Sequence, residues 1–146
     1  MNECINPDKI SSLKLFEIKE VNIFSKCKWN NTGVLLEKGC TYELQAIGNW
    51  SDKNIITDSN GYTSNRVPWY SYPFFLIGEF SRRQSDSNWF KLIGCFGKQE
   101  KMCFEIGTYK RITPLSTNVL YCYANDISYL YDNNSGYVKL FIQKIN

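Results

Sequence analysis

A twelve-residue stretch near the C-terminus, NDISYLYDNNSG at residues 125–136, contains two Asp and three Asn. Calcium takes about 6–8 oxygen ligands from carboxylates, Asn side chains and main-chain carbonyls. Asp126 offers a charged oxygen, Asn133 and Asn134 offer neutral ones, and the main-chain carbonyl near Leu130 could face inward. The stretch therefore has the residue types of a calcium-binding loop.

The same residue types also make ordinary turns, because Asn, Asp and Ser side chains bond their own backbone and Gly permits tight bends. From composition alone, a plain turn is the favoured interpretation and calcium binding is the alternative. A simple hairpin needs only about two to five connecting residues, so this loop is longer than a turn requires. Its spacing does not follow the EF-hand loop, which excludes that motif.

The loop lies between two segments with strong strand patterns. NVLYCYA at 118–124 is apolar on both faces, which predicts a central strand, and YVKLFIQK at 137–144 places its apolar residues on one face. TYELQAI at 41–47 alternates strictly between apolar and polar residues, which predicts a half-buried strand. Two neighbouring strands would therefore hold the ends of the loop.

Shorter apolar runs predict further strands: PFFLIGEF (73–80), WFKLIG (89–94) and MCFEIGTY (102–109). SSLKLFEIKEV at 11–21 suits a strand about as well as a helix. About seven or eight short strands separated by turn residues predict an all-β, two-sheet β-sandwich, with residues 1–146 forming one domain. The longest connection, 54–73, is of a length that is commonly functional or mobile.

Charge and composition argue against several classes of function. The formal net charge is +3, from 17 basic and 14 acidic residues, and the basic residues are scattered, which disfavours nucleic-acid binding. No window is apolar enough for a membrane span. The first residues lack the layout of a signal peptide, so we expect a cytoplasmic protein, export by a signal-independent route, or numbering after processing.

The chain contains no histidine, which excludes Ser-His-Asp and Cys-His nucleophilic systems. No glycine-rich phosphate-binding motif is present either. The six cysteines contain no Cys-x-x-Cys pair, so a structural zinc site is improbable. We expect a mixture of buried free thiols and one or two disulfide bridges, with a full disulfide framework as the alternative.

The segment LYCYANDISYLYDNNSGYVKLFI, residues 120–142, resembles the LecA-like family of calcium-dependent, galactose-binding bacterial lectins and related modules appended to hydrolases. Shorter matches precede it in order: AIGNW with Asp52, FLIGEF at 75–80 and FEIG at 104–107. The resemblance spans residues 32–142 and is most specific in the last third. Residues 1–31 would add less certain N-terminal strands.

This resemblance implies a small jelly-roll-like β-sandwich of the galactose-binding-domain type, with one Ca²⁺ at one end. It places the metal ligands on the side chains of Asp126, Asn133 and Asn134 and on the carbonyl of Leu130. One further carbonyl would come from Asp52, with Lys53 as the alternative. Two sugar hydroxyls would complete the coordination, so that a galactose-like glycan is the implied partner, and homo-oligomers are possible.

The implied carbohydrate contacts fall on two groups of residues. One group lies in the metal loop: Asp126, Ile127 and Asn133. The other lies in the loop after the Gly-Trp strand: Asp58, Asn60 and Tyr62. The galactose-binding members place a histidine and a glutamine in that second loop, and this chain has no histidine. The metal site therefore transfers better than the sugar preference.

Two further positions bear on the resemblance. The family's glycine within the metal loop is Asp132 here, which would either add a charge beside the ion or face solvent. Trp69, Tyr70 and Tyr72 could stack on a sugar face, although packing against the protein is the favoured interpretation of an aromatic cluster beside a proline.

Two other functions compete with a lectin. The same fold could serve as a structural or protein-interaction module, with or without Ca²⁺, and the missing histidine supports this alternative. An enzyme is disfavoured. An enzyme would need Asp52, Asp58, Asp126 and Asp132 to converge as glycosidase carboxyls. A carboxylate committed to calcium is a poor general acid, because the cation lowers its pKa.

Overall fold

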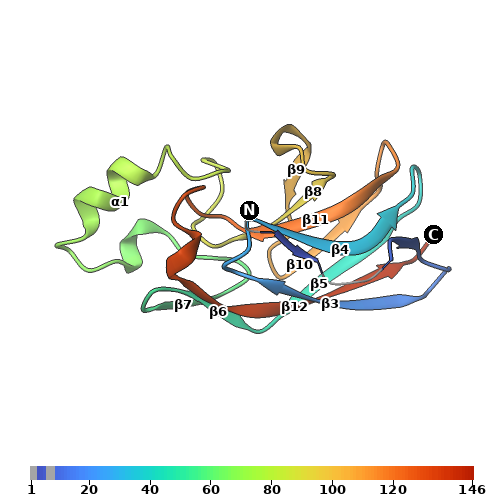
Figure 1. The fold of residues 1–146 in the computed structure, drawn as a ribbon, viewed down its shortest axis with the longest axis horizontal. Helices are drawn as coiled ribbons and strands as arrows, with labels where there is room; N and C mark the ends of the chain where they lie inside the picture. Colours follow the sequence, from blue (N-terminus) through green and yellow to red (C-terminus); the bar gives the residue numbers. More distant parts are fainter. Residues whose placement is uncertain (1–2, 6–8) are drawn as a thin grey trace.

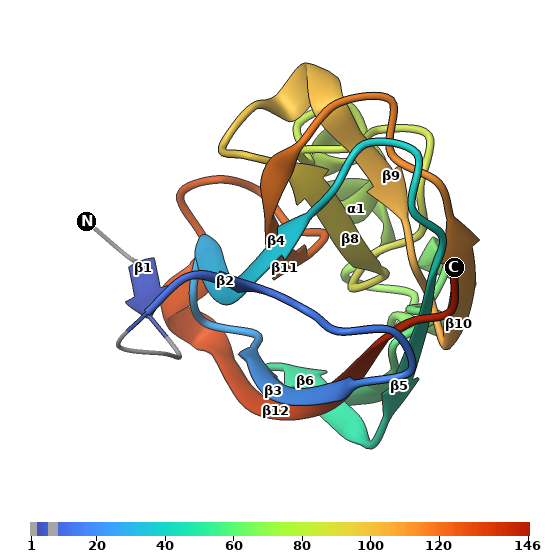
Figure 2. The ribbon, with the colours of Figure 1, turned by 90° about the vertical axis from the view of Figure 1, so that its right-hand side faces the viewer.

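A computed structural model describes residues 3–5 and 9–146 of the chain. Two β-sheets face each other, and each has six strands within these residues (Figures 1 and 2). This arrangement confirms the predicted all-β sandwich. None of the helices in the described part is long and apolar enough to cross a membrane.

The first sheet has the order β1-β4-β11-β8-β9, and β2 pairs with β4 in addition. Its strands are β1 (Glu3–Ile5), β2 (Ser11–Ser12), β4 (Trp29–Leu36), β8 (Leu92–Phe96), β9 (Cys103–Glu105) and β11 (Asn118–Ala124). β1 and β2 run parallel to β4, and the other pairs are antiparallel. β11 lies between β4 and β8, which confirms the central strand expected from its two apolar faces.

The second sheet has the order β10-β5-β12-β6-β7, and β3 also pairs with β12. Its strands are β3 (Ile18–Phe24), β5 (Tyr42–Ile47), β6 (Asn49–Asp52), β7 (Ile55–Asp58), β10 (Tyr109–Ile112) and β12 (Asn134–Lys144). All of these pairs are antiparallel. β12 is the organising strand, because it pairs with β3, β5 and β6.

Alternating side chains fill the space between the sheets. On β12, Val138, Leu140 and Ile142 are fully buried, and Tyr42 and Leu44 of the neighbouring strand β5 point into the same core. Burial of apolar surface at roughly 25 cal/mol per Å² is the main force that holds the two sheets together.

The remaining elements are short helices: η1 (Ser64–Arg66), α1 (Tyr72–Gly78), η2 (Glu100–Met102) and η3 (Tyr131–Asn133). The predicted strand at 73–80 was wrong, because this segment forms α1 at one end of the molecule (Figure 1). Pro73 lies in the first turn of the helix, where its missing N–H costs nothing. Residues 73–80 pair with no strand in the described part of the chain, so their backbone forms no inter-strand hydrogen bonds.

Four other predictions need adjustment. The run at 102–109 is divided between the two sheets, because β9 ends at Glu105 and β10 begins at Tyr109, with Gly107 at a φ of +62° between them. The run at 89–94 becomes a strand only from Leu92, because Phe90 has a φ of +59° and breaks the extended backbone. The ambiguous run at 11–21 forms β2 and the first part of β3. The long connection at 54–73 contains β7, η1 and the first two residues of α1.

The cysteines confirm the mixed expectation. Cys4 is bonded to Cys27, and Cys95 is bonded to Cys103. Cys40 and Cys122 are free thiols, and Cys122 is fully buried.

Candidate functional site

The candidate calcium loop closes one end of the sandwich between β11 and β12. Asn125 begins it and is fully buried. Its side-chain amide donates to the carbonyl oxygens of Gln84 (2.8 Å), Ser87 (3.2 Å) and Asn88 (3.0 Å). Asn125 therefore fixes the start of the loop to the segment that precedes β8, and its amide group is fully used in doing so.

Asp126 follows with a buried carboxylate that is only 2% exposed. Its Oδ1 accepts a hydrogen bond from the Ile127 N–H (2.7 Å), and its Oδ2 accepts one from Nδ2 of Asn134 (2.9 Å). Burial raises the pKa of Asp126 to about 6, and the negative charge of Asp52 adds to this shift. Loss of water disfavours the charged form of the carboxyl group, and a nearby cation would offset this cost by stabilising the negative charge.

Asn133 and Asn134 complete the group of side-chain oxygens. The Oδ1 atoms of both residues are buried and accept no hydrogen bond from any residue that the structure describes. The other side of the Asn134 amide is occupied, because Nδ2 donates to Asp126 and to the carbonyl oxygen of Ser25 (3.1 Å). An unsatisfied buried acceptor costs about 1–3 kcal/mol. Two amide oxygens and one carboxylate are donors of the kind that Ca²⁺ prefers.

The turn after β6 reaches the same place from the second sheet. Asp52 is paired in register with Asn134, and the Lys53 N–H donates to the Asn133 carbonyl oxygen (3.2 Å). The Asp52 carboxylate accepts a hydrogen bond from the Tyr62 hydroxyl (2.6 Å). Burial raises the pKa of Asp52. The structure thus brings the predicted β6 end and the predicted loop together.

A pocket of about 210 Å³ opens between these segments. It is lined by Asp52, Lys53, Phe74, Phe75, Gly78, Trp89, Asp126, Ile127, Leu130 and Asn133. Four of the five residues predicted as metal ligands line it, and the fifth, Asn134, is bonded directly to Asp126. One wall comes from α1 and from Trp89, which the sequence analysis did not place near the site.

Gly78 shapes this wall of the pocket. A Cβ atom added to Gly78 would lie 3.2 Å from Cδ1 of Ile127 and 3.4 Å from Cη2 of Trp89. The proline near the start of the 73–80 run and the glycine near its end were the available signals for a short helix. The apolar residues of that run also do not alternate as a half-buried strand would require.

The predicted carbohydrate contacts divide into two groups. Asp126, Ile127 and Asn133 line the pocket. Asp58 and Asn60 do not line it: Asp58 Oδ1 accepts the Asn60 N–H (2.8 Å), and Asn60 Oδ1 accepts the Thr108 N–H (3.0 Å). Tyr62 is 2% exposed, and its hydroxyl is committed to Asp52.

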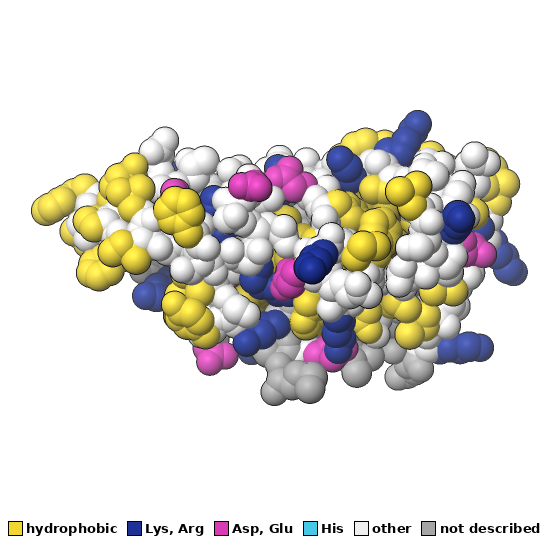
Figure 3. Space-filling model, turned by 90° about the horizontal axis from the view of Figure 1, so that it is seen from above, with side chains coloured by type: hydrophobic (Ala, Val, Ile, Leu, Met, Phe, Trp, Pro, Cys, Tyr) yellow, Lys and Arg dark blue, Asp and Glu magenta, His cyan; other side chains and the backbone are white. Residues whose placement is uncertain are grey.

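The aromatic residues just before α1 and at its first position are exposed, so the expectation that they pack was wrong. Trp69 is 85% exposed, Tyr70 is 65% exposed and Tyr72 is 38% exposed. Further exposed apolar residues follow along the chain: Phe74, Leu76, Ile77 and Phe80. Figure 3 shows apolar side chains gathered at the end of the molecule that carries α1.

Acidic residues alone do not define a metal centre here. Within the described residues, no three His, Cys, Asp or Glu side chains gather as a metal site. Only two carboxyl groups, those of Asp52 and Asp126, line the pocket. Asp132, at the position of the family's glycine, is exposed and does not line it. Any cation would depend mainly on neutral oxygens.

Comparison with known proteins gives one informative result. No family model matches the sequence, and no curated protein matches it. Among solved structures, the chain is similar to one described as "EclA N-terminal domain; PllA-like lectin". The match has a TM-score of 0.59 and 18% sequence identity, and it covers 86% of this chain and 94% of the other.

The chain has a lectin-like fold. At this level of identity the likeness concerns the fold, and it supports a lectin-like sandwich without singling out the LecA-like family. The likeness extends to the two-sheet sandwich and does not identify a ligand.

Proposed function

We propose that this protein is a calcium-dependent carbohydrate-binding protein. The observation that carries the proposal is the pair of buried, unpartnered amide oxygens of Asn133 and Asn134, which lie on the loop of the buried Asp126 carboxylate. This donor set fits Ca²⁺, which prefers carboxylate and amide oxygens. The main-chain carbonyls of Leu130 and of Asp52, or alternatively of Lys53, would add neutral ligands.

When bound, the cation would supply coordination positions for two neighbouring hydroxyls of a sugar. The chain's own groups would do the rest of the binding. Asp126 and Asn133 line the pocket and could accept hydrogen bonds from sugar hydroxyls. Phe74, Phe75 and Trp89 offer an apolar wall to the less polar face of a sugar ring.

The sugar class follows from this arrangement only in part. A galactose-like ligand is proposed from the resemblance of the metal loop. Of the second loop, neither Asp58 nor Asn60 lines the pocket, and Tyr62 is buried. The α1 wall takes the place that this loop was expected to have, so we expect a preference that differs from that of the histidine-containing lectins.

A glycan array tests the proposal. We expect glycans with a free pair of neighbouring hydroxyls to bind in calcium and to be released by a chelator such as EGTA. Asp126→Ala should abolish this binding, whereas Asp132→Ala, in the same loop but exposed, should retain it. Absence of binding to every glycan in calcium would contradict the proposal. A melting temperature that still depended on calcium would then favour the structural or protein-interaction module.

Glycoside hydrolysis is the second candidate, because two carboxyl groups with raised pKa values line one pocket. Binding is favoured over catalysis because a carboxylate that holds a cation is a poor general acid, since the cation lowers its pKa. The Asp52 carboxylate accepts a hydrogen bond from the Tyr62 hydroxyl. Turnover of nitrophenyl glycosides that is lost in Asp52→Asn would favour the enzyme.

A further inference from the structure

A second cavity adjoins the proposed sugar pocket. Its volume is about 280 Å³, and it is lined by Asp52, Lys53, Asn54, Ile55, Arg66 and Pro68. Asp52 and Lys53 line both cavities, so the two lie on either side of the turn between β6 and β7. Each is smaller than the roughly 300–1,000 Å³ of a pocket for a whole small molecule. The two cavities together would suit a ligand with two linked groups, one group in each cavity.

The second cavity is lined by two basic side chains, and Arg66 differs from the other arginines of the chain. Lys53 and Arg66 have no ion-pair partner in the described part of the chain, whereas Arg82, Arg83 and Arg111 each contact a carboxylate. The cavity's own carboxyl, Asp52, is buried and hydrogen-bonded to a tyrosine. The exposed charge around this cavity is therefore positive.

The Arg66 guanidinium is oriented by one hydrogen bond, which uses only one of its nitrogen atoms. One guanidinium nitrogen, Nη2, donates to the Ile56 carbonyl oxygen at 2.9 Å. Arginine carries five N–H donors in a planar fork that matches carboxylates and sulfates. The guanidinium is thus oriented by the backbone of β7, and its other donors remain available for an anion.

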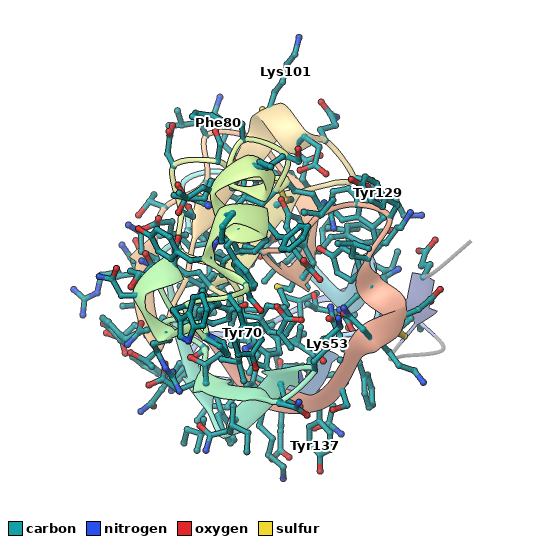
Figure 4. All side chains as sticks on the ribbon, turned by 90° about the vertical axis from the view of Figure 1, so that its left-hand side faces the viewer. Lys53, Tyr70, Phe80, Lys101, Tyr129 and Tyr137 are labelled. Atoms are coloured by element: carbon teal, nitrogen blue, oxygen red, sulfur yellow. A yellow bond between two sulfur atoms is a disulfide. The ribbon has the colours of Figure 1, made fainter. Side chains whose placement is uncertain are left out.

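Lys53 has a positive φ, a backbone conformation that lysine rarely adopts. Asp52 pairs with Ile55, so Lys53 and Asn54 form a two-residue hairpin turn, and the φ of Lys53 is +50°. Glycine, Asn or Asp is favoured at such a position. The turn is also fixed to the metal loop through the bond from the Lys53 N–H to Asn133. Figure 4 looks onto this end of the molecule and shows Lys53 on it.

We propose that the second cavity is a subsite for an anionic group, a carboxylate or a sulfate ester, carried by the glycan whose neutral sugar occupies the first pocket. This inference rests on the proposed function. Lys53 and Arg66 would bind the anion through charge-assisted hydrogen bonds, which are stronger than neutral ones. The preference should also weaken as salt concentration rises, because both side chains are exposed.

The experiment compares matched pairs of oligosaccharides that differ only in an acidic group, with a sulfated series and a uronic-acid or sialic-acid series, all in calcium. The readout is the ratio of affinities, acidic over neutral. We expect a ratio of about ten in at least one series, the effect of a single good charge-assisted hydrogen bond. The series with the higher ratio identifies the anion.

Variants connect this ratio to the cavity. Arg66→Gln should bring the ratio close to one and leave the affinity for the neutral glycans unchanged, because Arg66 lines only the second cavity. Arg66→Lys should keep part of the ratio. Lys53→Gly should also lower the ratio, and it should fold at least as stably because glycine accepts a positive φ. Lys101→Gln, an exposed lysine outside both cavities, is the control and should change nothing.

The possible failures are distinct. Neutral glycans that bind while acidic partners bind no better would overturn the anion subsite and leave the proposed function intact. A ratio that survives both Arg66→Gln and Lys53→Gly would also overturn it. If no glycan of either kind bound in calcium, the proposed function would fail and this inference with it.

Discussion

At the scale of single residues, the loop between β11 and β12 contains two buried amide oxygens that have no hydrogen-bond partner in the described part of the chain. Asp126 carries the charge, and Asn133 and Asn134 carry the unpartnered oxygens. Most buried polar groups in proteins are hydrogen-bonded, so such exceptions call for a bound group. A cation would satisfy both amide oxygens and would offset the charge of the buried Asp126 carboxylate, whose two oxygens each accept one hydrogen bond from the chain.

Removing calcium should therefore destabilise the protein. A ligand present at 100 times its dissociation constant stabilises by about 2.7 kcal/mol. We expect the melting temperature of the wild type to fall when a chelator is added, as measured by thermal unfolding. Asp126→Ala should show no response to the chelator, while Asp132→Ala should respond like the wild type. A full chelator response in Asp126→Ala would contradict the assignment of Asp126 as a ligand.

The titration of Asp126 gives a second prediction, for protein kept free of calcium. Its pKa is about 6 in the folded state, against about 3.9 for an ordinary Asp. Between these values the folded state binds more protons than the unfolded state, so the free energy of unfolding should fall as pH rises from about 4 to about 6. The loss should be on the order of 2–3 kcal/mol.

Other carboxyl groups titrate in the same range, so the comparison must be made against a variant. Glu43 and Glu105 have lowered pKa values and act in the opposite direction, whereas the pKa of Asp52 is raised and Asp52 acts in the same direction as Asp126. Urea unfolding of the wild type and of Asp126→Asn at several pH values isolates the contribution of Asp126. A difference between the two proteins that did not change between pH 4 and pH 6 would show that Asp126 is not buried as described.

At the scale of elements, the sequence predicted the strands around the site better than the walls of the pocket. Strands β5, β11 and β12 carry period-two or two-faced apolar patterns because tertiary packing buries them in that way. The segment at 73–80 was mistaken for a strand because a short apolar run does not distinguish a strand from a helix. This segment packs against Ile127 and Trp89, which lie in other parts of the chain, and a local sequence pattern cannot predict such contacts.

The role of α1 as a wall can be tested at Gly78. Gly78→Leu should fill the pocket, since even a Cβ there would contact Ile127 and Trp89. We expect a loss of glycan affinity of about tenfold or more, with calcium affinity unchanged because Gly78 offers no ligand oxygen from its side chain. Gly78→Ala should have a smaller effect. Calorimetry with calcium and then with a glycan separates the two. Equal losses of calcium and glycan binding would indicate misfolding of the loop instead.

At the scale of the whole molecule, the fold and the candidate site depend on different residues. The sandwich is held by buried residues such as Leu140 on β12, whereas the apolar residues around α1 are exposed at one end. The two-sheet β-sandwich could be predicted from alternation and turn residues alone. The resemblance of the loop to a lectin family predicts a metal site there, and this stays a prediction. The second cavity could not be predicted, because Lys53 and Arg66 meet only through the geometry of the β6–β7 turn and η1.

Substitutions in the two regions should differ accordingly. Leu140→Ala removes a fully buried side chain and should cost about 2–5 kcal/mol of unfolding free energy. Phe80→Ala removes a side chain that is 89% exposed and should cost little, within about 0.5 kcal/mol. Urea denaturation measures both. A large loss in Phe80→Ala would mean that the end of the molecule around α1 contributes to the core.

The most direct test of the central claim is a crystal structure of the protein grown with calcium and examined for anomalous scattering at the loop. The account predicts one ion with the side-chain oxygens of Asp126, Asn133 and Asn134 about 2.3–2.6 Å away. A loop without an ion, in which the amide oxygens of Asn133 and Asn134 accept hydrogen bonds from the chain itself, would contradict it.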